Sequence, residues 1–434
     1  MKTACIIGAG SSGITAAKAL HEQNISFDCF EAGSGIGGNW RFMNDNGMSS
    51  SYRSLHINTN RKVMAYADYA MPDHYPMFPH HSNILEYFEN YVDHFGFRQH
   101  IQFNTKVIAV TKNDDGTFLV ELSNGKAETY QHVLIANGHH WNPRLPEPAF
   151  EGTFSGETLH SHFYKTSDQV ANKRLLVVGI GNSAVDIACE AARLHTGKVT
   201  ISTRSGAYII PNWIWSMPFD DLASPLTAKL PLFLQRVLLR TSLWLARGSQ
   251  KAYGVPVPKR PVLSEHPTLS QDLLNLTGRG LIHYKGNIKR FEGQNVIFED
   301  GSQEAFDMIV YATGYKVTFP FLKDVSFNDL NIEKTNDLQL YKRVIHPDHE
   351  NLYFLALVQP LGAIMPLAEV QSKWIAKLIS QTCKLPNKAD MQADIAKEKQ
   401  KVIARYSNSP RHTLQVDFHP YRQSVLREIE KTKV

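Results

Sequence analysis

Short, largely apolar runs alternate along this chain with segments of helical period. The runs Ala4–Ile7, Ile25–Phe30 and His132–Ala136 are typical of parallel strands that are buried on both faces. Between the first two runs, residues 12–23 place alanine and leucine on one face, as a helix packed against a sheet does. The order strand, helix, strand predicts a βαβ unit at the start of the chain.

The same alternation returns near the middle of the chain. Arg174–Val178 and Val199–Thr203 are predicted strands, and residues 183–194 form a predicted helix between them. Further buried strands are predicted at residues 307–313 and 352–358. The sequence therefore predicts a second βαβ unit, followed by strands that complete the sheets.

Other segments have weaker but readable patterns. Ser82 is expected to cap a helix that runs to about Phe95 with an apolar face. Strands are expected at 101–103, 106–110 and 117–122, and a polar helical tail is expected from about Pro386. None of these segments is assigned any chemistry from its residue pattern alone.

A glycine loop, GAGSSG, follows the first predicted strand directly. Gly8 permits the tight turn, Gly10 lets a pyrophosphate approach the backbone, and Gly13 lets the helix pack close to the strand. The helix N-terminus attracts anions, and Glu31 at the end of the second strand suits ribose hydroxyls. This unit therefore predicts an FAD site. Its loop residues are Gly8, Ala9, Gly10, Ser11, Ser12 and Gly13. The later GGNW turn resembles the second glycine pair of FAD enzymes with two dinucleotide folds, which implies that Gly38, Asn39 and Trp40 lie beside the cofactor.

A second loop, GIGNSA, follows the middle strand, and here the second strand ends at Arg204 rather than at a carboxylate. A guanidinium pairs with a 2′-phosphate, which a carboxylate would repel. This unit therefore predicts an NADPH site. Its expected cofactor residues are Gly179, Gly181, Asn182, Ser183 and Arg204.

These units predict an α/β fold with two Rossmann-like dinucleotide-binding domains, the NADPH domain being inserted into the FAD domain. The expected boundaries are 1–165 for the first part of the FAD domain, 166–311 for the NADPH domain, and 312–434 for the completion of the FAD domain and the C-terminal helices. Residues 207–266 form an irregular insertion in the second domain. Within it, 229–247 is rich in leucine but interrupted by basic residues, which argues against a membrane span. We expect a lid over the active site, with a helix lying on a membrane surface as the alternative.

Composition narrows the class of protein. The chain has 43% hydrophobic and 20% charged residues and a net charge of +5 without a dense basic block, which makes nucleic acid a poor candidate partner. Its four scattered cysteines never form a CxxC pair, so no metal site and no dithiol chemistry are predicted, and a reducing, cytoplasmic location is expected. A homodimer is compatible with these features.

Several motifs together resemble the flavin-containing monooxygenases. The segment Phe154–Lys165 matches F-x-G-x-x-x-H-x-x-x-Y-K, and Tyr52, Ser54, Leu55 and Asn58 match Y-x-S-[VL]-x-x-N. With the glycine loops and the late ATGY motif, the resemblance covers nearly the whole chain. Asp68-Tyr69-Ala70 departs from the family's Asp-Phe-Pro. The resemblance places Asn58 at the flavin as the catalytic residue, and Thr59, Val107 and Thr313 at the cofactors.

The resemblance implies that NADPH reduces FAD and that O₂ then forms a C4a-hydroperoxyflavin, which oxygenates an amine or sulfide. By this account, Phe154–Lys165 is the hinge between the two domains and not the site of chemistry. Two alternatives remain. One is Baeyer–Villiger oxidation of ketones, although the hinge here ends in Tyr164-Lys165 rather than Trp-Pro or Trp-Asp. The other is an NADPH oxidase or flavin reductase that makes peroxide.

Overall fold

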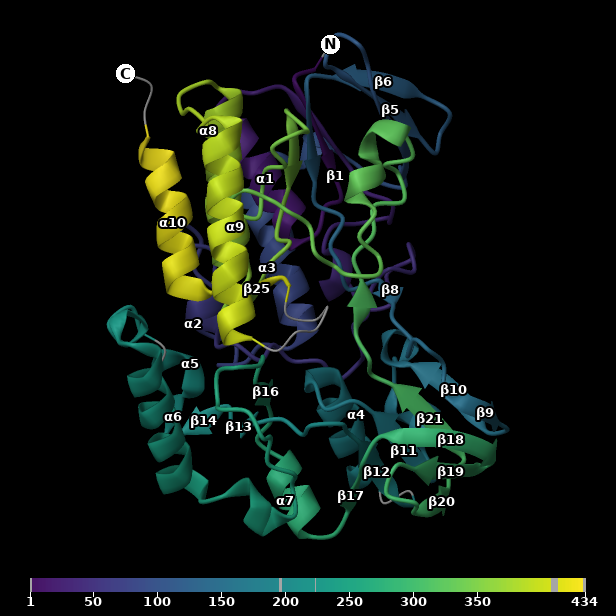
Figure 1. Ribbon diagram of the computed structural model, residues 1–434. Helices are drawn as coiled ribbons and strands as arrows, with labels where there is room; N and C mark the ends of the chain where they lie inside the picture. The colour runs from purple at the N-terminus through teal and green to yellow at the C-terminus, as the bar shows by residue number, and fades with distance from the viewer. Residues whose placement is uncertain (1, 195–196, 223, 407–412, 432–434) are drawn as a thin grey trace. The chain divides into compact units, whose positions relative to one another are not determined.

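The computed structural model describes residues 2–194, 197–222, 224–406 and 413–431 (Figure 1). The chain folds into two compact units of mixed α/β structure. Unit 1 comprises residues 1–51, 55–142 and 316–434, and unit 2 comprises residues 52–54 and 143–315.

A five-stranded parallel sheet forms the centre of unit 1. Its order is β23-β7-β1-β2-β3, and every neighbouring pair is parallel. The strands are β1 (Ala4–Ile7), β2 (Phe27–Phe30), β3 (Ile101–Gln102), β7 (His132–Ile135) and β23 (Leu352–Phe354). The apolar runs predicted at residues 4–7, 25–30, 132–136 and 352–358 are thus confirmed as strands.

Both faces of this sheet are covered, which explains why its strands are apolar without alternation. Ala4 and Ile6 pack against the helical side, whereas Cys5 and Ile7 pack against the side of the three-stranded sheet. The elements on the two sides are α1 (Ser11–Glu22), α3 (His81–His94) and α8 (Met365–Ile379), and β4 (Val107–Lys112), β5 (Phe118–Leu122) and β6 (Ala127–Tyr130).

The remaining elements of unit 1 are short or peripheral. A two-stranded parallel sheet joins β24 to β25. The helical tail predicted from about Pro386 is confirmed for α9 and α10, but it also contains the short strand β25, and its residues 407–412 and 432–434 lie outside the described residues. Their bounds are η1 (Gly38–Trp40), α2 (Arg61–Met64), η2 (Arg98–His100), η7 (Val325–Leu330), β24 (Gln359–Leu361), α9 (Lys388–Arg405), β25 (Gln415–Asp417) and α10 (Phe418–Glu430).

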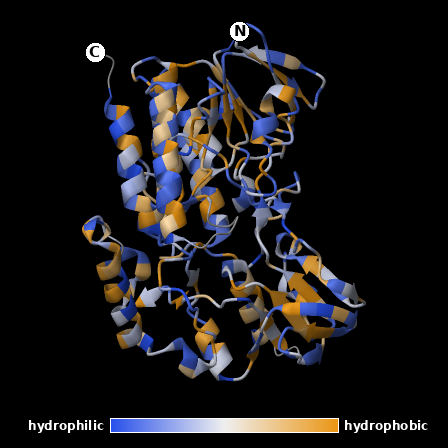
Figure 2. Ribbon diagram, viewed as in Figure 1, coloured by the Kyte–Doolittle hydropathy of each residue, from blue (hydrophilic) through white to orange (hydrophobic). Residues whose placement is uncertain are grey.

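Unit 2 contains a second five-stranded parallel sheet, of order β10-β21-β11-β12-β17. In Figure 2 hydrophobic residues are concentrated on the strands of both sheets. The strands of this sheet are β10 (Glu157–His160), β11 (Leu175–Val178), β12 (Val199–Ser202), β17 (Ile282–Lys285) and β21 (Met308–Tyr311), and α4 (Asn182–Arg193) connects β11 to β12.

A four-stranded sheet, order β20-β19-β18-β9, and two short ribbons complete unit 2. Phe150 and Phe154 pack on Phe291 of this sheet. The bounds are β9 (Glu151–Phe154), η3 (Ser161–Phe163), η4 (Ser167–Val170), β13 (Ile209–Ile210), β14 (Trp213–Ile214), β15 (Met217–Pro218), α5 (Phe219–Leu222), η5 (Thr227–Lys229), η6 (Gln250–Tyr253), β16 (Thr268–Leu269), α7 (Leu273–Gly278), β18 (Ile288–Gly293), β19 (Asn295–Phe298) and β20 (Gln303–Ala305). The strands β8 (Asn142–Pro143) and β22 (Tyr315–Lys316) lie where the chain passes between the units.

The insertion contains one long helix, α6 (Leu232–Arg247), which buries Leu243 but also exposes large apolar side chains, while two of its arginines donate to backbone carbonyls. Arg236 donates to the carbonyl of Val262 at 3.0 Å, and Arg247 donates to that of Ile209. Phe233 and Trp244 are each 64% exposed. Among the described residues, no helix is long and apolar enough to cross a membrane.

Two details differ from the sequence-based expectations. The units divide at 142/143 and 315/316, not at 165/166 and 311/312. The reason is a long-range pairing: Leu159 of the hinge segment lies beside Val310 in the parallel ladder of the second sheet. The second difference is the cap of α3, which is His80 and not Ser82, because the His80 side chain accepts the Ser82 backbone N–H.

Cys5 and Cys29 are core residues of unit 1. Both side chains are fully buried, and burial raises the pKa of each thiol well above its usual value. Only the thiolate form of cysteine is a good nucleophile or metal ligand. These two thiols are therefore not available for chemistry.

Candidate functional site

The first glycine loop has a backbone that only glycine accommodates. Gly8 has a φ of +101°, and a Cβ added there would lie 2.8 Å from the carbonyl oxygen of Ala136. A Cβ at Gly13 would lie 1.8 Å from the carbonyl oxygen of Gly8. The start of α1 is therefore packed directly onto the loop that leads into it, as a pyrophosphate-binding turn requires.

The N-terminus of α1 is open to an anion. The helix begins at Ser11 after Gly10, and no side chain caps its first N–H groups. The GGNW turn packs against this loop: Gly37 donates to the carbonyl of Ala9 at 3.0 Å, and a Cβ at Gly38 would lie 3.0 Å from the Gly10 Cα. Uncapped N–H groups and a close approach of two backbones fit the pyrophosphate of FAD.

The Glu31 carboxylate is held against the loop. Its Oε2 accepts the N–H of Ala9 at 2.8 Å, and its Oε1 accepts Gly33 N–H at 2.8 Å and the Asn46 amide at 3.0 Å. A carboxylate offers about four acceptor positions, so capacity for one ribose hydroxyl remains. Contact with both hydroxyls, as the sequence analysis expects, requires the Asn46 amide to move.

Asn39 and Trp40 belong to η1, directly after Gly38. The Asn39 side-chain oxygen accepts the Ser50 backbone N–H at 2.8 Å, and its carbonyl accepts the Ser51 hydroxyl at 2.6 Å. Asn39 therefore anchors the segment that leads to Tyr52, a positioning role that the sequence pattern does not reveal.

Asn58 lies in a loop of unit 1, and its amide makes no hydrogen bond to another described residue. Its neighbours Ile57 and Thr59 are buried, while Asn58 itself is partly exposed. The turn-forming role that a loop asparagine often has belongs here to Asn60, which caps α2 by accepting from Lys62 and Val63 at 3.0 and 3.1 Å. The Asn58 amide is thus available to a ligand.

Val107 opens β4 and is buried. The register of β4 with β5 shifts between Val107 and Ala109. Such a bulge leaves backbone groups outside the regular ladder. A cofactor would therefore contact the backbone of Val107 rather than its buried side chain.

The second glycine loop has the same backbone features as the first, but Ala184 stands in place of the third glycine. Gly179 has a φ of +124°, and a Cβ there would lie 2.5 Å from the carbonyl oxygen of Ala312. α4 begins after Gly181 without a side-chain cap, which fits a second pyrophosphate. Ala184 is fully buried at the position that corresponds to Gly13, so α4 has room for a methyl group where α1 has none.

Asn182, at the start of α4, uses its side-chain oxygen for a hydrogen bond within unit 2. Its Oδ1 accepts the N–H of Leu269 at 2.9 Å. The Thr268 hydroxyl in turn donates to the carbonyl of Ile180 at 2.6 Å. The loop is thus braced by β16, and Asn182 retains its side-chain NH₂ and its backbone N–H for a ligand.

Backbone hydrogen bonds show which residues at the ends of β2 and β12 are equivalent. Gly8 donates to Phe30 at 2.8 Å, and Gly179 donates to Ser202 at 2.9 Å, so these two strand ends are equivalent. Glu31 is therefore matched by Thr203, and Arg204 stands one residue further on. A neutral threonine in place of the carboxylate removes the charge that would repel a 2′-phosphate.

Arg204 is exposed and makes no ion pair with another described residue. Thr313, by contrast, already donates its hydroxyl to the carbonyl of Arg144 at 2.5 Å. The Arg144 N–H donates to the carbonyl of Gly314 at 2.9 Å. Of these two predicted cofactor residues, Arg204 has a free charged group, and Thr313 joins two segments of unit 2.

A cluster of buried tyrosines and acids, which the sequence analysis did not identify, attaches residues 52–54 to α4. The Tyr52 hydroxyl donates to Asp186 at 2.5 Å, and the Tyr164 hydroxyl donates to Glu190 at 2.6 Å. Burial raises the pKa of Asp186 to about 6. The available signal was the spacing of Asp186 and Glu190, four residues apart on one helix face.

The hinge segment is held by packing and hydrogen bonds. Tyr164 is fully buried, and His160 Nδ1 accepts the His162 N–H at 3.1 Å. The ring of His160 lies 5.5 Å from that of Tyr315. These contacts make the segment a structural element of unit 2.

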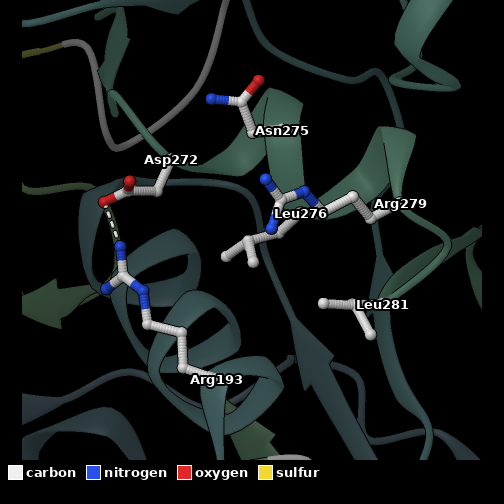
Figure 3. Close-up of a pocket in the computed structure, with 6 residues that line it drawn as sticks. All are labelled: Arg193, Asp272, Asn275, Leu276, Arg279 and Leu281. Atoms are coloured by element: carbon white, nitrogen blue, oxygen red, sulfur yellow. Dashed lines mark ion pairs between the residues drawn. The ribbon is translucent and has the colours of Figure 1, made fainter.

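A hollow of about 280 Å³ lies at the other end of α4 from the glycine loop. Arg193, at the last turn of α4, pairs there with Asp272 at 2.5 Å (Figure 3). α4 has 12 residues, and at about 1.5 Å per residue the hollow is a helix length from the loop. It is therefore not the dinucleotide site.

Comparisons with known proteins agree with this geometry. The family model described as "Flavin-binding monooxygenase-like" matches residues 1–433. "Flavin-containing monooxygenase 5" of Mus musculus is 38% identical over 441 residues, which cover 96% of this chain and 80% of the relative. "Dimethylaniline monooxygenase [N-oxide-forming] 2" of Rattus norvegicus is 35% identical over 451 residues, covering 99% and 83%.

Solved structures are similar over the whole length. The S-allyl-L-cysteine S-oxygenase of Allium sativum has a TM-score of 0.71 and 25% identity and covers 100% of this chain and 89% of its own. A steroid monooxygenase bound to NADP has a TM-score of 0.72, covering 99% and 98%, but at 17% identity it shows the fold alone. The family match and the relatives lead to one conclusion: the chain belongs to the flavin-containing monooxygenases, as an NADPH-dependent oxidoreductase whose cofactors are FAD and NADPH.

Proposed function

We propose that the protein oxygenates a soft nitrogen or sulfur nucleophile, with FAD in unit 1 and NADPH in unit 2. One observation carries the assignment of the two cofactors. Each unit has an uncapped glycine-loop helix, but the equivalent strand ends differ, with Glu31 in unit 1 and Thr203–Arg204 in unit 2. A dinucleotide without a 2′-phosphate suits the first end, and one with a 2′-phosphate suits the second.

Each residue then has a defined task. The N–H groups at Gly10–Gly13 and at Gly181–Ser183 would hold the two pyrophosphates, and Glu31 and Arg204 would hold the ribose hydroxyl and the 2′-phosphate. Bound FAD supplies the redox chemistry, accepting a hydride from NADPH and passing one oxygen atom of O₂ to the substrate.

We assign Asn58 to hydrogen bonds with the bound cofactors, as the catalytic residue. Its amide both donates and accepts and has no proton to lose at working pH. The amide is not engaged by another described residue, in contrast to that of Asn60. Thr59 and the Val107 backbone would complete the FAD site.

The substrate class rests on the relatives. The printed names of two similar proteins specify N-oxide formation and S-oxygenation. A likeness to cyclohexanone monooxygenase, at 17% identity, concerns the fold alone. We therefore favour amines and sulfides over ketones, and Tyr164-Lys165 at the end of the hinge agrees with this choice.

The discontinuous composition of unit 1 supports insertion of the NADPH domain into the FAD domain. For the insertion within unit 2, we retain the lid as our proposal because the exposed apolar side of α6 requires an apolar partner; a membrane surface is the alternative. A cytoplasmic location and a homodimer also remain proposals.

A substrate panel tests the function. The FAD-loaded protein is given NADPH and O₂ with a tertiary amine, a thioether or a cyclic ketone, and product and H₂O₂ are counted per NADPH consumed. We expect nearly one product per NADPH with an amine or a thioether. Peroxide equal to NADPH with every amine and thioether, or product from the ketone alone, would contradict the proposal.

Replacing Arg204 by alanine tests the NADPH assignment. A charge-assisted pair contributes about 1.5–3 kcal/mol, so the KM for NADPH should rise by about 10- to 100-fold. The KM for NADH, which lacks the phosphate, should change little. Arg290→Ala is the control, because Arg290 is a partly exposed arginine of unit 2 that pairs with Glu292. Equal effects of Arg204→Ala on both KM values would remove its phosphate role.

A further inference from the structure

We propose that Asp329, His346 and His349 form a binding site for one divalent transition-metal ion of the zinc class. Cysteine spacing predicts no metal site in this chain, and these three residues are not cysteines. The three donor groups come from η7 and from the turn His346-Pro347-Asp348-His349 that precedes β23. Their ligand atoms all lie within 4.8 Å of one another.

The turn brings the two imidazoles to the same side of the backbone. The N–H of His349 donates to the carbonyl of His346 at 3.2 Å, and the ring centroids are 4.7 Å apart. The spacing H-x-x-H is thus converted by a tight turn into a pair of adjacent ligands. This pairing needs no movement of the backbone.

The distances between donors are those of ligands on one ion. His349 Nε2 lies 2.9 Å from Asp329 Oδ2, and His346 Nε2 lies 3.5 Å from the same oxygen. Two ligands bound to zinc at about 2.0–2.2 Å with angles between a right angle and the tetrahedral value lie roughly 2.9–3.5 Å apart. An ion can therefore enter with small side-chain adjustments.

The histidine side of the site is buried, and the aspartate side is exposed to solvent. His346 and His349 are 9% and 6% exposed, and the ring of buried Phe327 lies 5.4 Å from that of His349. The Asp329 side chain is 48% exposed. The two imidazoles are thus buried, and that of His349 packs against an aromatic ring, while the carboxylate side admits the ion and leaves a position for water.

The donor set indicates which ions are bound. Two imidazole nitrogens and one carboxylate oxygen suit zinc, cobalt, nickel or copper, whereas magnesium and calcium prefer oxygen donors alone. Without a metal, His346 Nδ1 accepts the N–H of Asp348 at 3.2 Å. Binding through Nε2 moves the ring proton to Nδ1 and gives up this contact, so we expect micromolar affinity rather than that of a four-ligand structural site.

The consequence of binding would be structural. η7 and the HPDH turn are separated by some 15 residues of chain, and the turn leads directly into β23, an edge strand of the unit 1 sheet. An ion would cross-link the two segments. Because a ligand that binds only the folded state stabilises it, the melting temperature should rise with the concentration of the ion.

The test uses the full FAD-loaded chain after treatment with a chelator. Zn²⁺ is titrated by calorimetry and Co²⁺ by difference absorption, with Mg²⁺ and Ca²⁺ as comparison ions. We expect one Zn²⁺ per chain with micromolar Kd, a Co²⁺ ligand-field band, and a rise of a few degrees in melting temperature. His349→Gln should weaken Zn²⁺ binding by at least about tenfold, since one of three ligands is lost.

The exposed His283 of β17 provides the matched control, and His283→Gln should leave the titration unchanged. Asp329→Asn, at a half-exposed position, serves as a second variant if His349→Gln does not fold, and flavin content and circular dichroism report folding. The proposal is overturned if both site variants bind Zn²⁺ like the unaltered chain. It is also overturned if no stoichiometric Zn²⁺ binding occurs, or if Mg²⁺ produces the same stabilisation.

Discussion

Asn58→Ala should retain FAD and continue to consume NADPH, but its rate of substrate oxygenation should fall by about 10²- to 10³-fold. This is the usual cost of losing one preorganised hydrogen-bond donor at a reacting centre. The amide makes no bond to another described residue, so its removal leaves no partner unsatisfied in unit 1. Electrons from NADPH should then appear as H₂O₂. Product, H₂O₂ and NADPH are measured together, with the flavin content taken from the absorbance of the purified protein.

Asn60→Ala is the matched control for Asn58→Ala. Asn60 is the same residue type two positions away, but its side chain caps α2. Its loss should lower the free energy of unfolding by about 1 kcal/mol and leave product per NADPH unchanged. Undiminished coupled turnover in Asn58→Ala would refute the catalytic assignment, and loss of FAD from that variant would show a structural role instead.

The second large effect is expected from Gly13→Ala. The added Cβ would lie 1.8 Å from the carbonyl oxygen of Gly8, a backbone atom that cannot move without opening the loop. α1 would be displaced from the position in which its N–H groups face a pyrophosphate. We expect the purified variant to contain little FAD and to have no monooxygenase activity, as measured by flavin absorbance and NADPH consumption.

The second loop supplies the control for Gly13→Ala. Ala184 occupies the equivalent position, where the methyl group is accommodated and fully buried. Ala184→Gly should keep both cofactors and lower stability by about 0.5–1 kcal/mol, the helix cost of glycine. A Gly13→Ala protein with one FAD per chain would show that the loop does not hold this cofactor.

Much of the fold could be predicted because its signals are local. β1 and β11 are continuous apolar runs, and each is followed at once by glycines whose positive φ values are now seen at Gly8 and Gly179. The helix starts follow from these glycines. The chemistry of a dinucleotide site is thus encoded within about 30 residues of chain.

Other features could not be predicted from the sequence, because they depend on contacts with residues distant in the chain. The hinge segment was placed with the first domain, but Glu157–His160 pairs with Met308–Tyr311. The ion-pair network of Asp68 with Lys18 and Lys373 likewise joins three separate segments, at the place where the chain departs from the family's Asp-Phe-Pro.

The amino-acid sequence by itself determined the family, the two glycine loops and the charge difference between their strand ends, because each is a matter of residue type and short-range order. The tertiary structure decided that Thr203 rather than Arg204 corresponds to Glu31. It also decided that Asn60 and not Asn58 caps a helix, and that two histidines meet an aspartate from another segment. Strand register, side-chain hydrogen bonds and burial are set by long-range packing, and a local pattern does not contain them.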